Sequence, residues 1–236
     1  IKYDNFNIDT IPTREMSKIT TLITNDSYLV KGTIREHLSV RKNITEEEMY
    51  NALEKVNLKD FVEEHGGLDY ELAIGAANLS GGQRQRIGVA RAISLNPRLI
   101  IADEPVSALD LSVQAQVLNF MKKIQKDMGL SYLFISHDLG VVKHMCDYIN
   151  IMYRGRLVEK GTKEDIYKNP QHIYTKRLIA AIPETDPRLK EQLIANRIKV
   201  EKEYKELEKE YYNEKGRVYD LVKLTDTHYV AKKEVK

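Results

Sequence analysis

Two short apolar runs in the sequence end abruptly in residues that can bind metal ions or move protons. Leu99–Ala102 is followed by Asp103 and Glu104, and Tyr132–Ile135 is followed by Ser136-His137-Asp138. Such runs are typical of strands buried in a parallel sheet, and ligands of these sheets bind beyond the carboxyl ends of the strands. Two adjacent carboxylates are costly there unless their charge is compensated, and Mg²⁺ shared with phosphate oxygens would compensate it. The alternative is a strand that reaches solvent with hydrated acids.

A second candidate lies upstream, where Leu79-Ser80-Gly81-Gly82-Gln83 precedes a helical pattern that ends before Asn96-Pro97. Ser80 is suited to cap this helix, and the glycines allow a ligand to approach the backbone closely. Free amides at a helix N-terminus favour an anion. A Ser-Gly-Gly helix start alone is usually only a turn, but the pentapeptide followed by Arg84-Gln85-Arg86 is harder to ascribe to chance.

The elements that must position these residues alternate between strand and helix patterns. Ile19–Ile23 is a further apolar run, Ile1–Ile8 alternates as a strand does, and Thr45 is placed to cap a helix over Glu46–Val56. A helix with one apolar face is predicted between the two apolar runs, and Gly129 is placed to cap its C-terminal end. Strand, helix and strand in this order indicate a βαβ crossover. Residues 148–152 and 156–158 are expected to form an antiparallel hairpin. The face of the predicted helix consists of Val113, Val117, Phe120, Met121, Ile124 and Met128.

Composition narrows the class of protein. The 236 residues carry 37 basic and 35 acidic side chains, a formal net charge of +2, which gives no reason to expect nucleic acid as a partner. The single cysteine, Cys146, excludes a disulfide framework and any metal centre built from several cysteines. Neither a membrane-spanning apolar stretch nor a signal peptide is recognisable, so we expect a protein of cytosolic type that reaches a membrane only through partners.

These motifs together resemble the nucleotide-binding subunits of ABC transporters. Leu79–Gln83 is similar to the signature motif of that family, and Leu99–Glu104 to its Walker B strand with the catalytic glutamate. Ser107–Asp110 resembles the D-loop, and His137 the switch histidine, in the same order along the chain. The resemblance implies an α/β, P-loop NTPase-like core with a parallel sheet, a helical subdomain and a C-terminal extension of hairpin and helices. We expect the ATPase domain over residues 1–162, with the helical subdomain at about 33–95, and the extension over 163–236.

The resemblance also implies roles for the candidate residues, with ATP and Mg²⁺ as cofactors. Asp103 would help to hold Mg²⁺, Glu104 would polarise the attacking water, and His137 would contact the γ-phosphate. The signature residues would complete the nucleotide site of an opposite subunit, and Asp110 would lie at the dimer interface. One chain alone is therefore not expected to catalyse hydrolysis. The signature residues concerned are Ser80, Gly81, Gly82 and Gln83.

The sequence departs from the family pattern in two places. No G-x-x-x-x-G-K-[ST] phosphate loop occurs in the 236 residues, and we expect it upstream of Ile1, because Ile1–Ile8 resembles the strand that follows that loop and its helix. Asn25 stands where the family has the Q-loop glutamine. It keeps the amide but loses one methylene, which puts its contact with metal or with the membrane subunit in question.

The C-terminal part resembles one branch of the family. Asn169–Thr175 is similar to the Asn-Pro-x-His-x-Tyr-Thr segment of oligopeptide and dipeptide importer ATPases, and Ala181-Ile182-Pro183 also fits that branch. The resemblance implies a peripheral subunit on the cytoplasmic face of the cell membrane, paired in a heterodimer with a second ABC ATPase. It also implies contact with permease subunits and, through them, with an extracytoplasmic peptide-binding protein. Within this motif, His172 is interpreted as a surface or packing residue rather than a metal ligand.

The sequence leaves three other functions as alternatives. The first is a catalytically degenerate partner that supplies only its signature face, and Glu104 and His137 argue against it. The second is the ATPase of an ABC transporter with another substrate. An ABC protein of translation or DNA repair would need a tandem ATPase domain or a long coiled coil. Residues 187–217 carry alternating charges that favour a solvated helix packed on its own domain over a docking helix. Two ion pairs are expected on it, Glu201 with Lys205 and Lys202 with Glu206.

Overall fold

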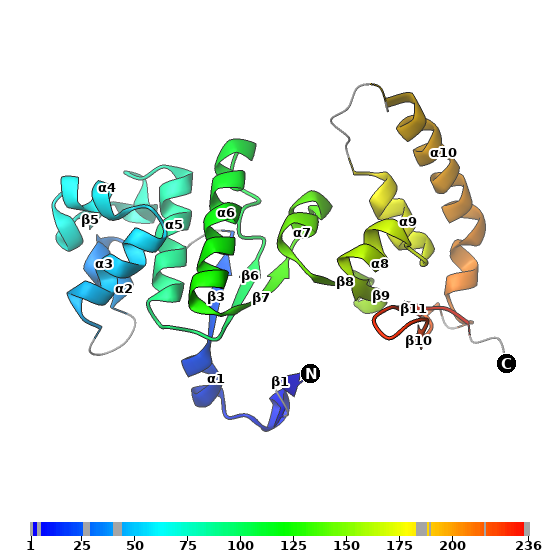
Figure 1. Cartoon of the computed structure of the whole chain (residues 1–236), viewed down its shortest axis with the longest axis horizontal. Coiled ribbons are helices and arrows are strands. Elements are labelled where there is room, and N and C mark those ends of the chain that lie inside the picture. Colours follow the sequence, from blue (N-terminus) through cyan, green and yellow to red (C-terminus); the bar gives the residue numbers. More distant parts are fainter. Residues whose placement is uncertain are drawn as a thin grey trace. The chain divides into compact units, whose positions relative to one another are not determined.

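The computed structural model divides the chain into two compact units, Ile1–His137 and Asp138–Lys236. The elements of both units are labelled in Figure 1. The structure describes residues 2–3, 6–25, 29–39, 44–182, 188, 190–214 and 216–233.

The first unit contains a parallel three-stranded sheet, which confirms the predicted α/β class. Its strands are β3 (Thr20–Thr24), β6 (Leu99–Asp103) and β7 (Ser131–Ile135), in the order β3-β6-β7. The register pairs Thr24 with Asp103 and Asp103 with Ile135, so the three strands end level with one another. The residues that follow each strand therefore lie at one edge of the sheet.

Helix α6 (Leu111–Met128) makes the predicted crossover between β6 and β7. Gly129 ends it with φ 63°, in the left-handed region where glycine is favoured. Ile100 and Ala102 of β6 are fully buried. The predicted apolar face is buried at Val117, Phe120, Met121 and Ile124.

A layer of helices precedes the crossover in the sequence. Thr45 caps its helix with a capping box, as predicted, and Thr33 forms a second box with Glu36. Helix α5 packs against α3, α6 and β3 (Figure 1). The remaining bounds are α2 (Ile34–Leu38), α3 (Glu46–Lys55), α4 (Lys59–Glu64), α5 (Gly81–Ile93), β4 (Gly32–Thr33), β5 (Glu71–Leu72) and the 3₁₀ turns Gly67–Asp69 and Ile74–Ala76.

The first residues do not form the single strand predicted over Ile1–Ile8. The structure has an antiparallel pair, β1 (Lys2–Tyr3) with β2 (Phe6–Asn7), then a 3₁₀ turn (Ile8–Thr10) and α1 (Thr13–Ile19). The sequence places Asp and Asn between the two strands, residue types that are favoured in turns.

The second unit is built on an antiparallel sheet of order β10-β11-β9-β8. The predicted hairpin is confirmed as β8 (Tyr148–Tyr153) and β9 (Arg156–Thr162), joined through Arg154 and Gly155, both with positive φ. Its core includes Val158 and Ile166, both fully buried. The other elements are α7 (Leu139–Met145), α8 (Lys163–Lys168), α9 (Ile173–Ala180), α10 (Lys190–Leu207), a 3₁₀ turn (Glu208–Tyr211), β10 (Leu221–Lys223) and β11 (Tyr229–Ala231).

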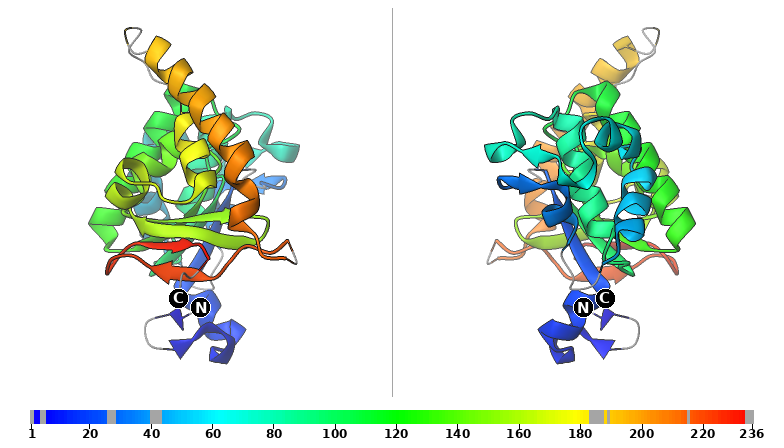
Figure 2. Two further views of the ribbon diagram at one scale, coloured as in Figure 1. Left: turned by 90° about the vertical axis from the view of Figure 1, so that its right-hand side faces the viewer. Right: turned by 90° about the vertical axis from the view of Figure 1, so that its left-hand side faces the viewer.

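Helix α10 packs along α9 (Figure 2, left), which agrees with a helix packed on its own domain. The predicted Lys202–Glu206 pair is present at 3.9 Å. Glu201, however, receives two hydrogen bonds from Arg177 of α9, at 2.8 and 3.2 Å, where a pair with Lys205 was predicted. A planar guanidinium matches a carboxylate in two places, which a lysine within one helix cannot do.

The domain boundary at residue 162 stays a prediction.

His172, predicted as a surface or packing residue, is a packing residue with 1% exposure. Its Nδ1 accepts a hydrogen bond from the Tyr174 amide at 3.1 Å, and its ring contacts Tyr211 edge to face. Burial lowers the pKa of His172 from 6.5 to about 4, so the ring is neutral at pH 7. In the described part of the chain, no group of three or more His, Cys, Asp or Glu residues could hold a metal ion.

Candidate functional site

Four predicted site residues follow or end the three parallel strands, and we call them the sheet-edge group: Asn25, Asp103, Glu104 and His137. Asp103 is the last residue of β6, is exposed, and lies in register beside Thr24, which directly precedes Asn25. His137 is the second residue after the end of β7. The sheet therefore brings together at one edge the carboxylates and the imidazole that the sequence predicted there, and it adds the amide of Asn25, which the sequence had assigned only to the Q-loop position.

Glu104 and His137 are in direct contact. The His137 backbone amide donates to Glu104 Oε1 at 2.8 Å, and His137 Nδ1 lies 2.7 Å from the same oxygen. Because a carboxylate only accepts hydrogen bonds, Nδ1 must carry the proton in this arrangement. The His137 side chain is 78% exposed while that of Glu104 is 27% exposed. The carboxylate is thus held from one side and faces a solvent-accessible imidazole.

The backbone of Glu104 is held in an unusual conformation, with φ 50° in the left-handed region. Its amide donates to Ile135 O at 2.9 Å, and its carbonyl oxygen accepts from the Ser107 hydroxyl at 3.1 Å. Non-glycine residues with positive φ are uncommon and cluster at functional sites. These bonds fix the direction in which the Glu104 side chain leaves the strand.

The remaining predicted residues form a second cluster, which we call the helix-tip group: Ser80, Gly81, Gly82, Gln83 and Asp110. Ser80 caps α5 as predicted. Its hydroxyl accepts from the Gln83 amide at 3.2 Å, and Gln83 Oε1 accepts from the Ser80 amide at 2.8 Å. This capping box uses both side chains locally, so it leaves the amides of the two glycines as the groups suited to an anion.

The helix tip packs closely against the start of α6. A Cβ on Gly82 would lie 2.8 Å from Val113 Cγ1, and one on Gly81 would lie 3.3 Å from a Leu109 methyl carbon. Asp110 caps α6, accepting from the Ser112 hydroxyl at 2.7 Å and the Val113 amide at 3.0 Å. These bonds hold the pKa of Asp110 below its usual value. Asp110 is therefore an ionised, exposed cap next to the glycine pair.

Sequence reasoning missed Gln85 of α5. Its side chain is only 2% exposed, and its Nε2 donates to Thr24 O at 3.2 Å. The only signal in the sequence was a glutamine within a helix that is otherwise apolar on its buried face. The bond joins the helix of the second group to the strand that leads into the first.

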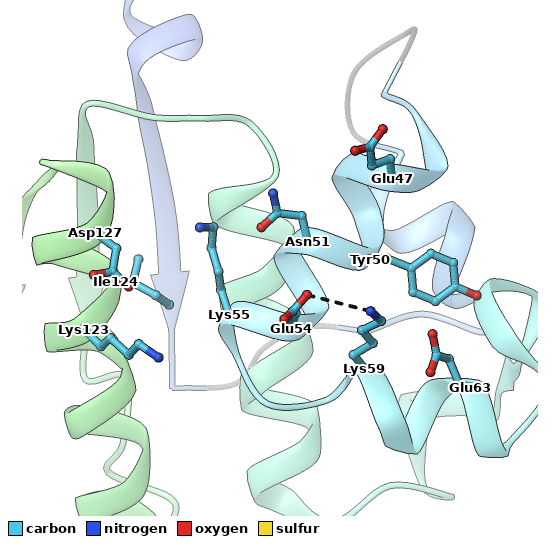
Figure 3. A pocket seen from close by; sticks show the side chains of 10 residues that line it. All are labelled: Glu47, Tyr50, Asn51, Glu54, Lys55, Lys59, Glu63, Lys123, Ile124 and Asp127. Atoms are coloured by element: carbon cyan, nitrogen blue, oxygen red, sulfur yellow. Dashed lines mark ion pairs between the residues drawn. The ribbon is translucent and has the colours of Figure 1, made fainter.

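A pocket of about 600 Å³ in the first unit contains none of the predicted site residues (Figure 3). It lies between α3, α4 and α6, and its walls carry charges of both signs, including the exposed Glu54–Lys59 ion pair at 3.8 Å. The sheet edge and the helix tip are thus separate from this pocket. None of the helices in the described ranges is long and apolar enough to cross a membrane.

Comparison with known proteins shows which families the chain resembles. Residues 1–107 match the family described as ABC transporter, and residues 158–216 match the oligopeptide/dipeptide transporter C-terminal region. A bacterial Atm1-family ABC exporter with ATP bound superposes with TM-score 0.62 and 25% identity, over 71% of this chain and 30% of the exporter chain. Residues 1–107 of the chain are therefore similar to ABC transporter ATPases.

Its similarity is to the peptide-transport branch of that family. The oligopeptide transport ATP-binding protein OppF of Lactococcus lactis is 59% identical over 152 residues, 64% of this chain and 48% of OppF. The dipeptide transport ATP-binding protein DppF of Escherichia coli is 60% identical over 108 residues, 46% of this chain and 32% of DppF. The chain spans about half the length of these relatives or less. It is a relative of the oligopeptide and dipeptide transport ATP-binding proteins.

Proposed function

We propose that these 236 residues belong to an ATP-hydrolysing subunit that powers peptide uptake by an ABC importer. The observation that carries the proposal is the Glu104 carboxylate, held at the end of a parallel strand by His137, in a chain whose residues 158–216 match the peptide-transporter region. The names of the relatives support oligopeptides or dipeptides as the cargo.

The sheet-edge group supplies the chemistry. Asp103 is an exposed carboxylate at a strand end, an oxygen donor of the kind that Mg²⁺ prefers, and Asn25 adds an amide oxygen at the same edge. Bound Mg·ATP supplies the electrophilic γ-phosphate. Glu104 is positioned to orient and polarise a water molecule, and His137 to contact the phosphate side. General-base assistance of this kind contributes about 10²–10⁴-fold to a rate.

The helix-tip group serves a different nucleotide. Ser80, Gly81, Gly82 and Gln83 would meet the ATP held by a second ABC ATPase, with the two glycines presenting their amides and Asp110 at the interface. A helix N-terminus with glycines allows this approach. Hydrolysis would then need two chains, most simply a heterodimer, and a phosphate loop contributed by polypeptide other than these 236 residues, which contain no such motif.

The subunit would sit at the cytoplasmic face of the membrane, held by permease subunits that receive peptide from an extracytoplasmic binding protein. Nucleic acid is not expected as a partner. The alternative is a partner that supplies only its helix tip while hydrolysis occurs elsewhere. It is favoured by Asn25 in place of glutamine, and opposed by the intact Glu104–His137 contact.

The test uses the native polypeptide that contains these residues, assembled with its permeases and partner ATPase in proteoliposomes. Glu104→Gln should reduce both ATP hydrolysis and peptide uptake at least about 100-fold while ATP binding is retained. Glu64→Gln, the same exchange at an exposed site on α4, serves as the control and should preserve both activities. Undiminished turnover in Glu104→Gln would favour the non-catalytic alternative.

A further inference from the structure

Gln85 makes a contact that the proposed function does not use. It lies on α5, four residues after Gly81, and its Nε2 donates to the carbonyl oxygen of Thr24 at 3.2 Å. The two residues are 61 positions apart in the sequence, and the side chain is 2% exposed. A buried primary amide is costly unless hydrogen-bonded, so this contact is a specific feature of the fold.

The acceptor, Thr24, lies next to the sheet-edge group. Thr24 is the last residue of β3 and pairs in register with Asp103, and the next residue is Asn25. Within the described sheet, β3 has a neighbouring strand, β6, on one side only. The bond from Gln85 therefore ties the end of β3 to the helix layer just where the chain turns into the sheet-edge group.

The donor, Gln85, lies close to the N-terminus of α5. Gln85 belongs to the second turn of α5, two residues after the end of the Ser80–Gln83 capping box that defines the helix tip. A helix is stiff over such a distance, because each turn is bonded to the next. A shift of the helix tip would therefore be transmitted through Gln85 to Thr24, and a shift of the strand end would be transmitted to the helix tip.

We propose that Gln85 is a positioning residue that fixes Asn25 at the sheet edge and links its placement to the helix tip. This rests on the proposed function for its importance to ATP hydrolysis. The physical link itself does not require hydrolysis. A residue that only fills space would serve equally well as methionine, which has nearly the same length and no donor.

The first test measures backbone amide exchange by mass spectrometry on the 236-residue chain. Gln85→Met should speed exchange in peptides covering residues 20–25 about tenfold, since a buried hydrogen bond is lost, while residues 111–128 of α6 keep their protection. Gln192→Met makes the same exchange at an exposed site on α10 and is the matched control. Equal exchange of residues 20–25 in Gln85→Met and wild type would overturn the proposal.

The second test uses Gln85→Glu, and it separates a hydrogen bond from packing. A protonated carboxyl can donate to Thr24 O, whereas an ionised one cannot. Protection of residues 20–25, corrected for intrinsic exchange, should therefore fall as the pH rises through the titration of the new side chain, and Gln85→Met should show no such step. A pH-independent result would also overturn the proposal. Neither test requires ATP turnover, so failure of the proposed function would be recognised separately.

Discussion

The imidazole of His137 and the carboxylate of Glu104 meet at 2.7 Å across the ends of two neighbouring strands. The same carboxylate oxygen also accepts the His137 backbone amide at 2.8 Å. Two donors from one residue therefore hold a side chain whose own backbone lies in the left-handed region. The two residues therefore form one hydrogen-bonded unit, and we predict that their contributions to ATP hydrolysis are not independent.

A double-mutant cycle tests that unit in the assembled transporter. Glu104→Gln should lower the hydrolysis rate about 10²–10⁴-fold, and His137→Ala should lower it by a smaller factor. The double variant should be slower than Glu104→Gln alone by less than the full His137→Ala factor, because His137 both contacts the phosphate and holds the Glu104 carboxylate. Rate losses that multiply would show that the two residues act separately.

The close approach of Gly82 to Val113 predicts a steric effect of a single methyl group. Helix propensity alone would make Gly82→Ala stabilising, but the new Cβ would meet Val113 Cγ1 at 2.8 Å. Val113 is β-branched and stiff, so the helix tip must shift, at a cost of about 1–3 kcal/mol. Urea unfolding of the 236-residue chain measures this cost.

Relief of the same contact provides the control for that experiment. The double variant Gly82→Ala, Val113→Ala should lose less free energy of unfolding than the sum of the losses in the two single variants. Strict additivity of the two losses, or a Gly82→Ala chain as stable as wild type, would contradict the packing seen between α5 and α6.

The lowered pKa of the buried His172 predicts that the stability of the second unit depends on pH. Above pH 6.5 the ring is neutral in both folded and unfolded chains and contributes nothing. As the pH falls from 6.5 towards 4, the unfolded chain takes up a proton that the buried ring resists, so the free energy of unfolding decreases. Between pH 7 and 4.5, His172→Gln should therefore lose about 2 kcal/mol less stability than wild type.

Urea titrations at the two pH values provide the measurement. His144→Gln, which removes an exposed histidine of α7, should keep the wild-type loss. An equal loss in wild type and in His172→Gln would mean that the buried ring is not the group responsible.

Local patterns were enough to predict much of the fold and of the site. Caps at Ser80, Thr45 and Gly129 depend on a few adjacent residues, and the strands that carry Asp103 and His137 are marked by short apolar runs. Because parallel strands end together, the common edge of Asp103, Glu104 and His137 also followed from the sequence, whereas the place of Asn25 beside them did not.

Contacts between distant residues could not be predicted in the same way. The Gln85–Thr24 bond spans 61 positions, and nothing near either residue indicates the other. Glu201 has a lysine at the helical spacing, yet it binds Arg177, which only the packing of α10 on α9 brings close. The left-handed backbone of Glu104 likewise depends on Ile135 and Ser107 rather than on its own residue type.

The central claim is that the sheet edge and the helix tip serve nucleotides held on two chains. It is tested most directly by a structure of the transporter assembly, formed with Glu104→Gln to prevent turnover and incubated with Mg·ATP. We predict residues 103, 104 and 137 around the γ-phosphate of one nucleotide, and the amides of Gly81 and Gly82 against the phosphates of the other. Acidic residues remote from any nucleotide, with the tip of α5 facing bulk solvent, would contradict the account.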